Sequence, residues 1–173
     1  MENSAAKSSK AGAVSSKYEI TVENAFKKYS DMIFRLAFVR TGSVADAEDL
    51  LSEVFIRLVK NIHKIKTEQH LKAWLVRVTV NCSNSFAACL AKNRHDTLEN
   101  IPQVSDEEEI RVLPFVLDLP NNFKTVIYLY YYEGYSTKEI ARLLRIAEGT
   151  VKSRLSRARK TLKNLIEGET FYV

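Results

Sequence analysis

The chain has 173 residues, 46% of them hydrophobic and 27% charged, which suits one or two small globular domains and excludes disorder throughout. Its formal net charge of +5 favours a polyanionic partner without identifying one. No apolar run approaches the roughly 20 residues of a membrane span, the N-terminus lacks a signal-peptide core, and the two cysteines have no neighbouring histidine to complete a zinc set, so we expect no membrane insertion, no metal, no cofactor and a cytoplasmic location.

The chain from Thr21 onward has helical apolar spacing and no strand pattern, so the predicted fold class is all-α. Residues 1–20 hold little that can be buried and predict a flexible tail. The first helix is predicted over residues 22–40, with Gly42 as its stop. We expect this helix to bury Ala25, Phe26, Tyr29, Ile33, Leu36 and Ala37.

A second helix is predicted over residues 44–61, capped by Ser43. Its polar face carries Asp46, Asp49 and Glu53, and the last two form an unfavourable like-charge pair at i,i+4 spacing. Two interpretations stay open for this face. It is either a solvated surface, eased by pairing of Glu53 with Arg57, or a docking surface for a basic partner.

A third helix is predicted over residues 68–91, capped by Thr67, with Trp74 and its apolar neighbours facing inward. Beyond it the apolar period is lost, and an acidic run occupies residues 106–109. We therefore predict a linker over residues 97–111. It separates a first domain at residues 21–96 from a second at residues 112–173.

The second domain carries the pattern of a helix-turn-helix. A helix predicted over residues 122–133 ends at Gly134, and a capping box of Ser136 and Glu139 starts a shorter one. After a three-residue turn, a long basic helix follows. Its apolar stripe consists of Val151, Leu155, Ala158, Leu162 and Leu165. A short helix, a turn and a basic helix predict DNA binding in the major groove.

The ordered set of motifs resembles the extracytoplasmic-function (group 4) sigma factors, which are bacterial transcription-initiation subunits. The resemblance rests on DAEDLLSEVF at residues 46–55, WLVRVTVN at 74–81, LP at 119–120, EIA at 139–141 and GTVKSRLSRAR at 149–159, and it covers residues 21–167. It implies a sigma-2 domain and a sigma-4 helix-turn-helix domain joined by the acidic linker, without the extra domains of larger sigma factors. The implied partners are core RNA polymerase and promoter DNA, with an anti-sigma factor as a further candidate.

The resemblance also implies roles for residues of the first domain. Asp46, Asp49 and Glu53 would dock on the clamp helices of the largest polymerase subunit. Asn81 matches the family residue that holds a base flipped from the non-template strand at the minus 10 element. The expected phosphate contacts beside it are Arg77, Lys92 and Arg94, whereas we expect Trp74 to be structural. The Asp and Arg residues that many relatives carry after Asn81 are missing here.

In the second domain the resemblance and the helical wheel select the same basic face. The expected minus 35 contacts are Thr150, Lys152, Ser153, Ser156, Arg157 and Lys160 on the basic helix, with Lys138 on the helix before it. Arg154 and Arg159 lie at the edges of the apolar stripe, and two roles stay open for them: a structural salt bridge or a DNA contact. Arg145 stands where the turn usually has glycine, which predicts either a different turn or a strained one. Ala147 offers no side-chain cap.

Two other classes fit parts of the sequence. An ordinary helix-turn-helix regulator would explain the second domain but would leave the acidic helix without a purpose. A DNA-processing enzyme is not expected, because the tyrosines at residues 128–135 lack the arginine and histidine set that would activate a nucleophile.

Overall fold

The computed structural model describes residues 20–89 and 114–169. Within these ranges the chain is helical and has no strand, which confirms the all-α prediction. The predicted linker, Lys92, Arg94 and nearly all of the predicted tail lie outside the described residues. The elements are α1 (Val22–Thr41), α2 (Val44–Asn61), the short 3-10 turn η1 (Ile62–Lys64), α3 (Glu68–Cys89), α5 (Asn121–Ile127), the π-helical segment η3 (Tyr128–Tyr132), α6 (Thr137–Leu144) and α7 (Glu148–Glu169).

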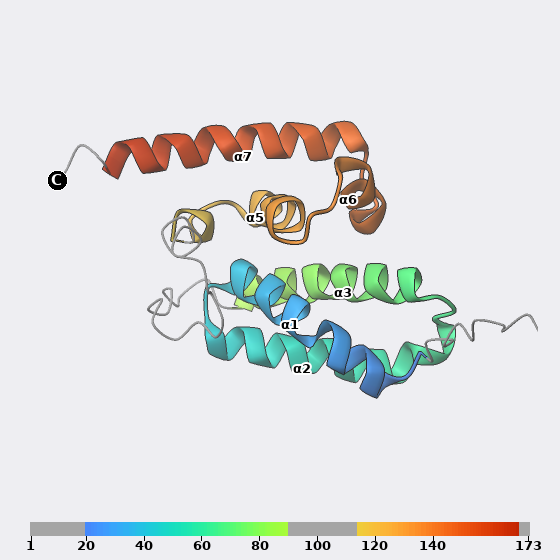
Figure 1. The fold of residues 1–173 in the computed structure, drawn as a ribbon. Coiled ribbons are helices and arrows are strands. Elements are labelled where there is room, and N and C mark those ends of the chain that lie inside the picture. The colour runs from blue at the N-terminus through green and yellow to red at the C-terminus, as the bar shows by residue number, and fades with distance from the viewer. Residues whose placement is uncertain (1–19, 90–113, 170–173) are drawn as a thin grey trace, which may run out of the picture.

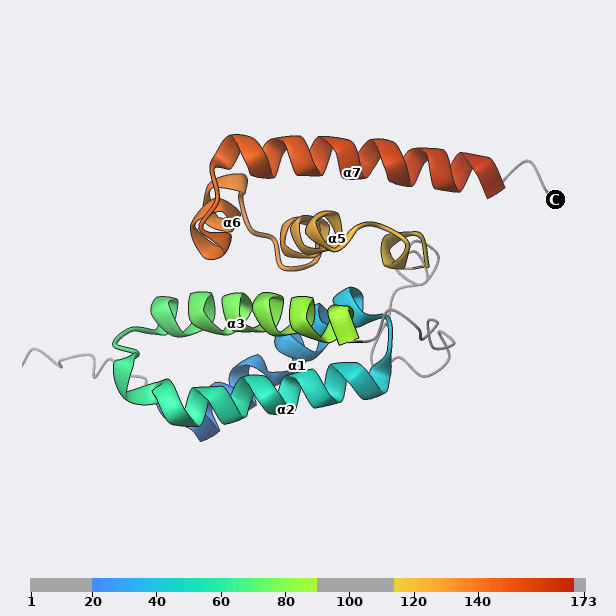
Figure 2. The same cartoon turned by 180° about the vertical axis from the view of Figure 1, so that it is seen from behind.

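The helices form two groups that pack against each other. Helices α1, α2 and α3 make a three-helix bundle, and α5, α6 and α7 make the second group (Figure 1). Contacts between the groups run from α1 to α5 and from α3 to α6. Helices α2 and α7 lie on the two outer sides, as the view from behind also shows (Figure 2). We call the two groups the first domain (α1–α3) and the second domain (α5–α7).

The helix ends predicted at Thr21, Gly42, Ser43, Thr67 and Ser136 are confirmed, because they depend on local side-chain chemistry. The hydroxyls of Thr21, Ser43 and Thr67 each accept a hydrogen bond from the backbone N–H three residues ahead. Gly42 closes α1 in the left-handed conformation, with φ of 74°. Ser136 and Glu139 form the complete reciprocal capping box.

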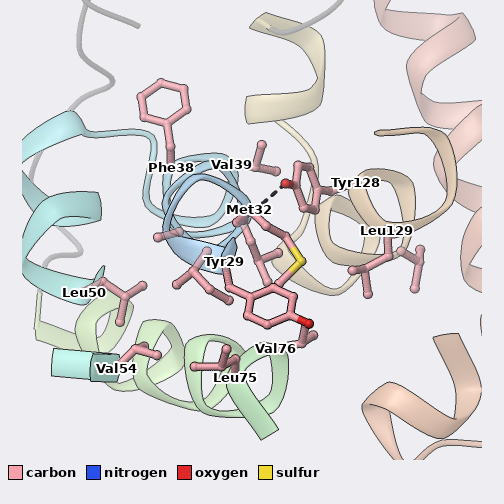
Figure 3. Packing of buried hydrophobic residues seen from close by; sticks show 14 of the residues in the cluster. Tyr29, Met32, Phe38, Val39, Leu50, Val54, Leu75, Val76, Tyr128 and Leu129 are labelled. Carbon is pink, nitrogen blue, oxygen red and sulfur yellow. Dashed lines mark hydrogen bonds between the residues drawn. The ribbon is translucent and has the colours of Figure 1, made fainter. Parts of the chain in front are cut away.

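The buried side chains form one continuous core that includes residues from both domains. Figure 3 shows this junction, where the Tyr128 hydroxyl donates a hydrogen bond to the backbone oxygen of Met32 on α1, at 3.2 Å. The sequence predicted two separate domains and gave no sign of a shared core. Within the second domain, α7 packs on α5 and α6 and buries Val151, Leu155 and Ala158 of its apolar stripe.

One predicted core residue is wrong. Phe26 is 48% exposed and packs edge-on against Phe55 of α2, with ring centroids 5.0 Å apart. It follows Ala25, which is fully buried, and so lies about 100° away from the buried direction of α1. Phe26 therefore lies on the flank of the helix. Trp74, Leu162 and Leu165, which the sequence analysis also placed on inward or apolar faces, are half-buried.

The helix predicted over residues 122–133 is interrupted. Its second half is the π-helical segment η3, in which the N–H of Glu133 bonds to the carbonyl of Tyr128 at 3.2 Å. The wider turn changes the direction of successive side chains. Tyr128 is buried against α1, whereas Tyr131 is 55% exposed.

Candidate nucleic-acid interface

The helix-turn-helix is built from α6, a tight turn at residues 145–147 and α7. Helix α6 ends at Arg145, whose φ of 56° and ψ of 45° are left-handed. Among the described residues Arg145 is the only non-glycine with positive φ, so the predicted alternative of a strained turn is the one observed. Ile140 from α6 and Val151 and Leu155 from α7 are buried and fix the two helices against each other.

The start of α7 is stabilised without a side-chain cap from Ala147. The hydroxyl of Thr137 on α6 donates a hydrogen bond to the Glu148 carboxylate at 2.8 Å, and Lys152 forms an ion pair with the same carboxylate at 2.9 Å. Hydrogen bonds from Lys152 and Thr137 lower the pKa of Glu148 below its ordinary value. The ionised carboxylate thus lies at the positive end of α7 and ties this helix to α6.

The predicted minus 35 residues lie on one accessible side of the second domain. Those exposed to solvent are Lys152, Ser153, Ser156, Arg157 and Lys160 of α7 and Lys138 of α6, whereas Thr150 is half-buried. The hydroxyl of Ser153 donates to the backbone carbonyl of Thr150 at 3.0 Å. Val151, Leu155 and Ala158 of α7 are buried, and α7 packs on α5 and α6, so the exposed basic face lies on the opposite side of the helix. Helix α7 lies on the side of the second domain away from the first domain (Figure 1).

The two arginines at the edge of the stripe differ in environment. Arg159 donates from Nε to the hydroxyl of Tyr131 at 2.7 Å, and its guanidinium lies 5.7 Å from the ring centroids of Tyr130 and Tyr131. Arg159 therefore makes a structural contact, but with two tyrosines and not with the carboxylate of a salt bridge. Arg154 is half-buried.

The minus 10 candidates of α3 face the second domain. Arg77 and Asn81 line a cavity of about 520 Å³ together with His70 and Trp74, and the opposite wall is the turn of the helix-turn-helix at Leu144 and Arg145. Asn81 is exposed. Trp74, which we expected to be structural, packs against the core and also lines this cavity.

Arg77 is held at the junction of the two domains. It donates a hydrogen bond to the backbone carbonyl of Leu143 on α6 at 3.5 Å. Burial and the neighbouring cation of Arg145 lower the pKa of Arg77 below its ordinary value. Two guanidinium groups thus share one cavity, and no carboxylate lines it.

The acidic residues of α2 are only partly gathered into one site. Asp49 and Glu53 line a groove of about 350 Å³ between α2 and α3, beside Ile56. Glu53 forms the predicted ion pair with Arg57, with Oε1 to Nε at 2.5 Å. Asp46 does not line the groove; it lies in the first turn of α2 and is half-buried.

Sequence reasoning missed an apolar surface next to this acidic groove. Phe26, Ile56 and Val59 are each about half exposed, and they line a second groove, between α1 and α2. Ile56 and Ser52 border both grooves, so the acidic and apolar surfaces are continuous. The sequence analysis did not predict this surface, because it assigned Phe26 to the core. The sequence does contain one indication of it: Ile56 is an apolar residue on the otherwise polar side of α2.

Other kinds of site have no support in the described ranges. These residues include no cluster of three or more His, Cys, Asp or Glu side chains arranged to hold a metal ion. Cys82 is a buried free thiol. None of the helices in residues 20–89 and 114–169 is both long and apolar enough to cross a bilayer.

A helical bundle joined to a helix-turn-helix with an exposed basic recognition helix defines a two-domain DNA-binding protein of the all-α class. The family Sigma-70 region 2 matches residues 25–88, and the family Sigma-70, region 4 matches residues 116–162. A solved structure, that of the sigma factor RpoE in complex with the anti-sigma factor NepR from Bartonella quintana, shares the fold. Its TM-score is 0.71 and its identity 20%, over 84% of this chain and 96% of that one.

Curated relatives place the chain within this family. The ECF RNA polymerase sigma factor SigW of Bacillus subtilis is 30% identical over 155 residues, covering 78% of this chain and 83% of SigW. SigM of Mycobacterium tuberculosis, another ECF RNA polymerase sigma factor, is 31% identical over 152 residues, covering 82% and 74%. The probable RNA polymerase sigma factor RfaY of Xanthomonas campestris is 29% identical over 147 residues, and the chain spans only 36% of its length. The chain belongs to the ECF sigma factors of the sigma-70 family, and it is a transcription-initiation factor, not an enzyme.

Proposed function

We propose that this chain binds core RNA polymerase, directs it to a bipartite promoter and promotes opening of the DNA strands. In this proposal residues 21–96 form the sigma-2 domain, residues 97–111 the linker and residues 112–173 the sigma-4 domain. The observation that carries the proposal is the exposed basic face of α7, whose opposite face is anchored by buried Val151 and Leu155. A rigidly held basic helix can enter the major groove.

The basic face supports recognition of the minus 35 element. Lys152 and Arg157 are the proposed base-reading residues, because lysine and arginine can donate to O6 and N7 of guanine. Ser153 and Ser156 would read less selectively. Lys160, Lys138 and Thr150 would hold backbone phosphates and set the register of the helix.

The exposed side chain of Asn81 supports recognition of the minus 10 element. Its amide can donate and accept at the edge of an unpaired base. Arg77 would contact a phosphate next to that base once it is released from Leu143, and Lys92 and Arg94 are proposed as further phosphate contacts. Base-edge contacts of this kind offset the loss of pairing when the duplex opens.

The acidic and apolar grooves on α2 support docking of the polymerase. Asp46, Asp49 and Glu53 would attract a basic element of the core enzyme, and Ile56, Val59 and Phe26 would supply apolar contact beside it. A combination of apolar contact and a charged rim is typical of protein–protein interfaces. Helix α2, which contributes residues to both grooves, lies on the side of the first domain away from the second domain (Figure 1).

Further partners and the location follow from the family. The solved relative RpoE is in complex with the anti-sigma factor NepR, so an anti-sigma factor is proposed as a partner of this chain. A subunit that acts with RNA polymerase on chromosomal DNA works in the cytoplasm of a bacterium. We therefore propose a cytoplasmic location.

The test is a substitution of both base-reading residues. Lys152→Ala combined with Arg157→Ala should weaken binding of the holoenzyme to a minus 35 duplex about 30-fold, from about 2 kcal/mol of lost contact, while core binding stays normal. Lys163→Ala is the matched control, because this exposed lysine lies near the C-terminal end of the same helix. Equal losses from the control and the double variant would refute the assignment.

A further inference from the structure

The cavity of about 520 Å³ between α3 and the turn of the helix-turn-helix has a positively charged lining. Arg77 of α3 and Arg145 of the turn both line it, and no Asp or Glu side chain does. The exposed side chains of His70 and Asn81 also border the cavity, so it is open to solvent. Its volume lies within the roughly 300 to 1,000 Å³ of small-molecule sites. The cavity can therefore admit a ligand from solution, and its charge favours an anion.

The two guanidinium groups of this cavity have few partners in the described parts of the chain. Arg77 is half-buried, and its side-chain hydrogen bonding to described residues consists of one long bond, 3.5 Å to the carbonyl of Leu143. The side chain of Arg145 has no hydrogen bond or ion pair to any described residue. Burial, and then the nearby cation of Arg145, lower the pKa of Arg77, so the two groups repel each other. An anion between them would offset this repulsion and accept hydrogen bonds from both.

The rest of the lining is largely apolar and includes the only tryptophan of the chain. Trp74, Val78, Val80 and Leu144 line the cavity, and the indole of Trp74 is half-buried between the core and this space. Aromatic side chains of this kind stack on nucleobases. The amide of Asn81 can both donate and accept at the edge of a base. Inorganic phosphate would leave these groups unused, so the lining fits a ligand that combines a phosphate with a planar ring.

The aromatic and basic parts of the lining lie close enough together for one small ligand. Trp74, Arg77 and Asn81 lie on successive turns of one side of α3, within roughly 10 Å along the helix axis at 1.5 Å per residue. Arg145 lies on the opposite wall, because α6 packs on α3 (Figure 2). A base and a phosphate joined through one ribose can reach both walls. Since Leu144 and Arg145 belong to the second domain, the cavity is more than the DNA-binding surface assigned to the first domain.

We propose that this cavity binds a free mononucleotide, with its phosphate between Arg77 and Arg145 and its base against Trp74. Asn81 contacts the edge of the base. The site shares Arg77 and Asn81 with the proposed minus 10 surface, but binding of a nucleotide by the free chain does not depend on that assignment. A bound nucleotide and a promoter strand exclude each other from these two side chains.

Binding is measured on the full-length free chain by isothermal titration calorimetry, with each of the ribonucleoside 5′-monophosphates of adenine, guanine, cytosine and uracil. At least one of them should bind with one-to-one stoichiometry and a Kd below about 1 mM. Inorganic phosphate and the corresponding nucleoside should each bind about tenfold more weakly or worse, since each engages only one part of the lining. Binding should also quench the fluorescence of Trp74, which is the chain's only tryptophan.

Arg145 and Arg142 provide a matched pair of variants. Both are exposed arginines at the C-terminal end of α6, but of the two only Arg145 lines the cavity. Arg145→Gln should weaken the mononucleotide affinity about tenfold or more, whereas Arg142→Gln, which loses the same charge, should stay within about twofold of wild type. Trp74→Leu should weaken mononucleotide binding and leave phosphate binding unchanged. Circular dichroism verifies that each variant keeps its helices, and the arginine pair decides the outcome if Trp74→Leu does not fold.

Three results would overturn the proposal. They are failure of all the mononucleotides to bind, equal weakening in Arg145→Gln and Arg142→Gln, and binding of inorganic phosphate as tight as that of the nucleotide. The last result would identify a simple anion site. A wild-type holoenzyme that fails to transcribe, while the free chain binds the nucleotide as expected, would instead refute the proposed function and leave the site intact.

Discussion

Replacing Arg145 by glycine should stabilise the protein, although the substitution removes a long side chain. Arg145 is exposed, and its φ of 56° places it in the left-handed region. Its side chain has no hydrogen bond or ion pair to any described residue, whereas its backbone N–H bonds to the carbonyl of Ala141. The substitution therefore removes strain and leaves the turn's hydrogen bonds in place.

The size of the effect follows from two opposing terms. The left-handed conformation costs an L-residue about 1 to 2 kcal/mol, and glycine does not bear this cost. Glycine loses about 0.4 to 1 kcal/mol more backbone entropy on folding. The net gain for Arg145→Gly is about 0.5 to 1 kcal/mol, which corresponds to an increase in melting temperature of about 1 to 4 °C for a chain of this size.

Thermal and urea unfolding measure this gain, with Arg142→Gly as the control. Arg142 is also exposed but lies inside α6, where glycine costs about 1 kcal/mol. The two arginine-to-glycine variants should therefore move the melting temperature in opposite directions. A decrease for Arg145→Gly comparable to that of the control would refute the assignment of strain at this turn.

Three further predictions concern other parts of the molecule. Asn81→Ala should slow promoter opening by the holoenzyme, measured by permanganate reactivity, more than it weakens closed-complex binding; an unchanged opening rate would argue against base capture. Asp49→Lys with Glu53→Lys should weaken core binding at least tenfold by reversing the attraction to a basic partner, and normal affinity would restore the interpretation as a solvated face. Burial lowers the pKa of Lys124 from 10.5 to about 8; Asp118 opposes this shift and Arg40 adds to it. The buried ammonium therefore destabilises the folded protein below pH 8. This destabilisation decreases as the pH rises from 8 towards 10.5, where the folded protein has lost the proton and the unfolded chain still holds it. Lys124→Met should thus be the more stable protein at pH 7, by up to about 3 kcal/mol, and the advantage in unfolding free energy should shrink at pH 10; an advantage that does not change with pH would contradict this cause.

Helix ends and the recognition helix could be predicted because their causes are local. The hydroxyl of Ser136 and the carboxylate of Glu139 are three residues apart, and the stripe of α7 repeats every three or four residues. The predicted burial of Phe26 was wrong because burial at the flank of a helix depends on contacts that are not local. Periodicity gives the buried direction of a helix, but the neighbouring helix decides how far around the flank burial extends.

The junction between the domains could not be predicted from spacing. Arg40 is a basic residue in the last turn of a helix, a position that usually faces water and stabilises the helix dipole. In the structure this side chain is buried and donates hydrogen bonds to the carbonyl of Asn121 and the hydroxyl of Thr125 on α5, which lie 81 and 85 residues further along the chain. Contacts over such separations depend on how whole domains pack, and no local pattern records them.

The sequence likewise predicted the residues of the minus 10 surface but not their position relative to the second domain. The i,i+3 and i,i+7 spacing puts Trp74, Arg77 and Asn81 on one side of α3. That this side faces the turn at Arg145 follows only from the packing of α6 on α3. The sequence therefore predicted a set of side chains as DNA contacts, whereas the structure shows that Leu144 and Arg145 of the second domain line the same cavity as Arg77 and Asn81.

The most direct test of the whole account is a footprint on a promoter selected from random DNA by the holoenzyme. The chain with core polymerase should protect the minus 35 and minus 10 elements together, and the chain alone should protect neither firmly. Firm protection of both elements by the chain alone, or failure of the chain to co-elute with core polymerase, would contradict the account.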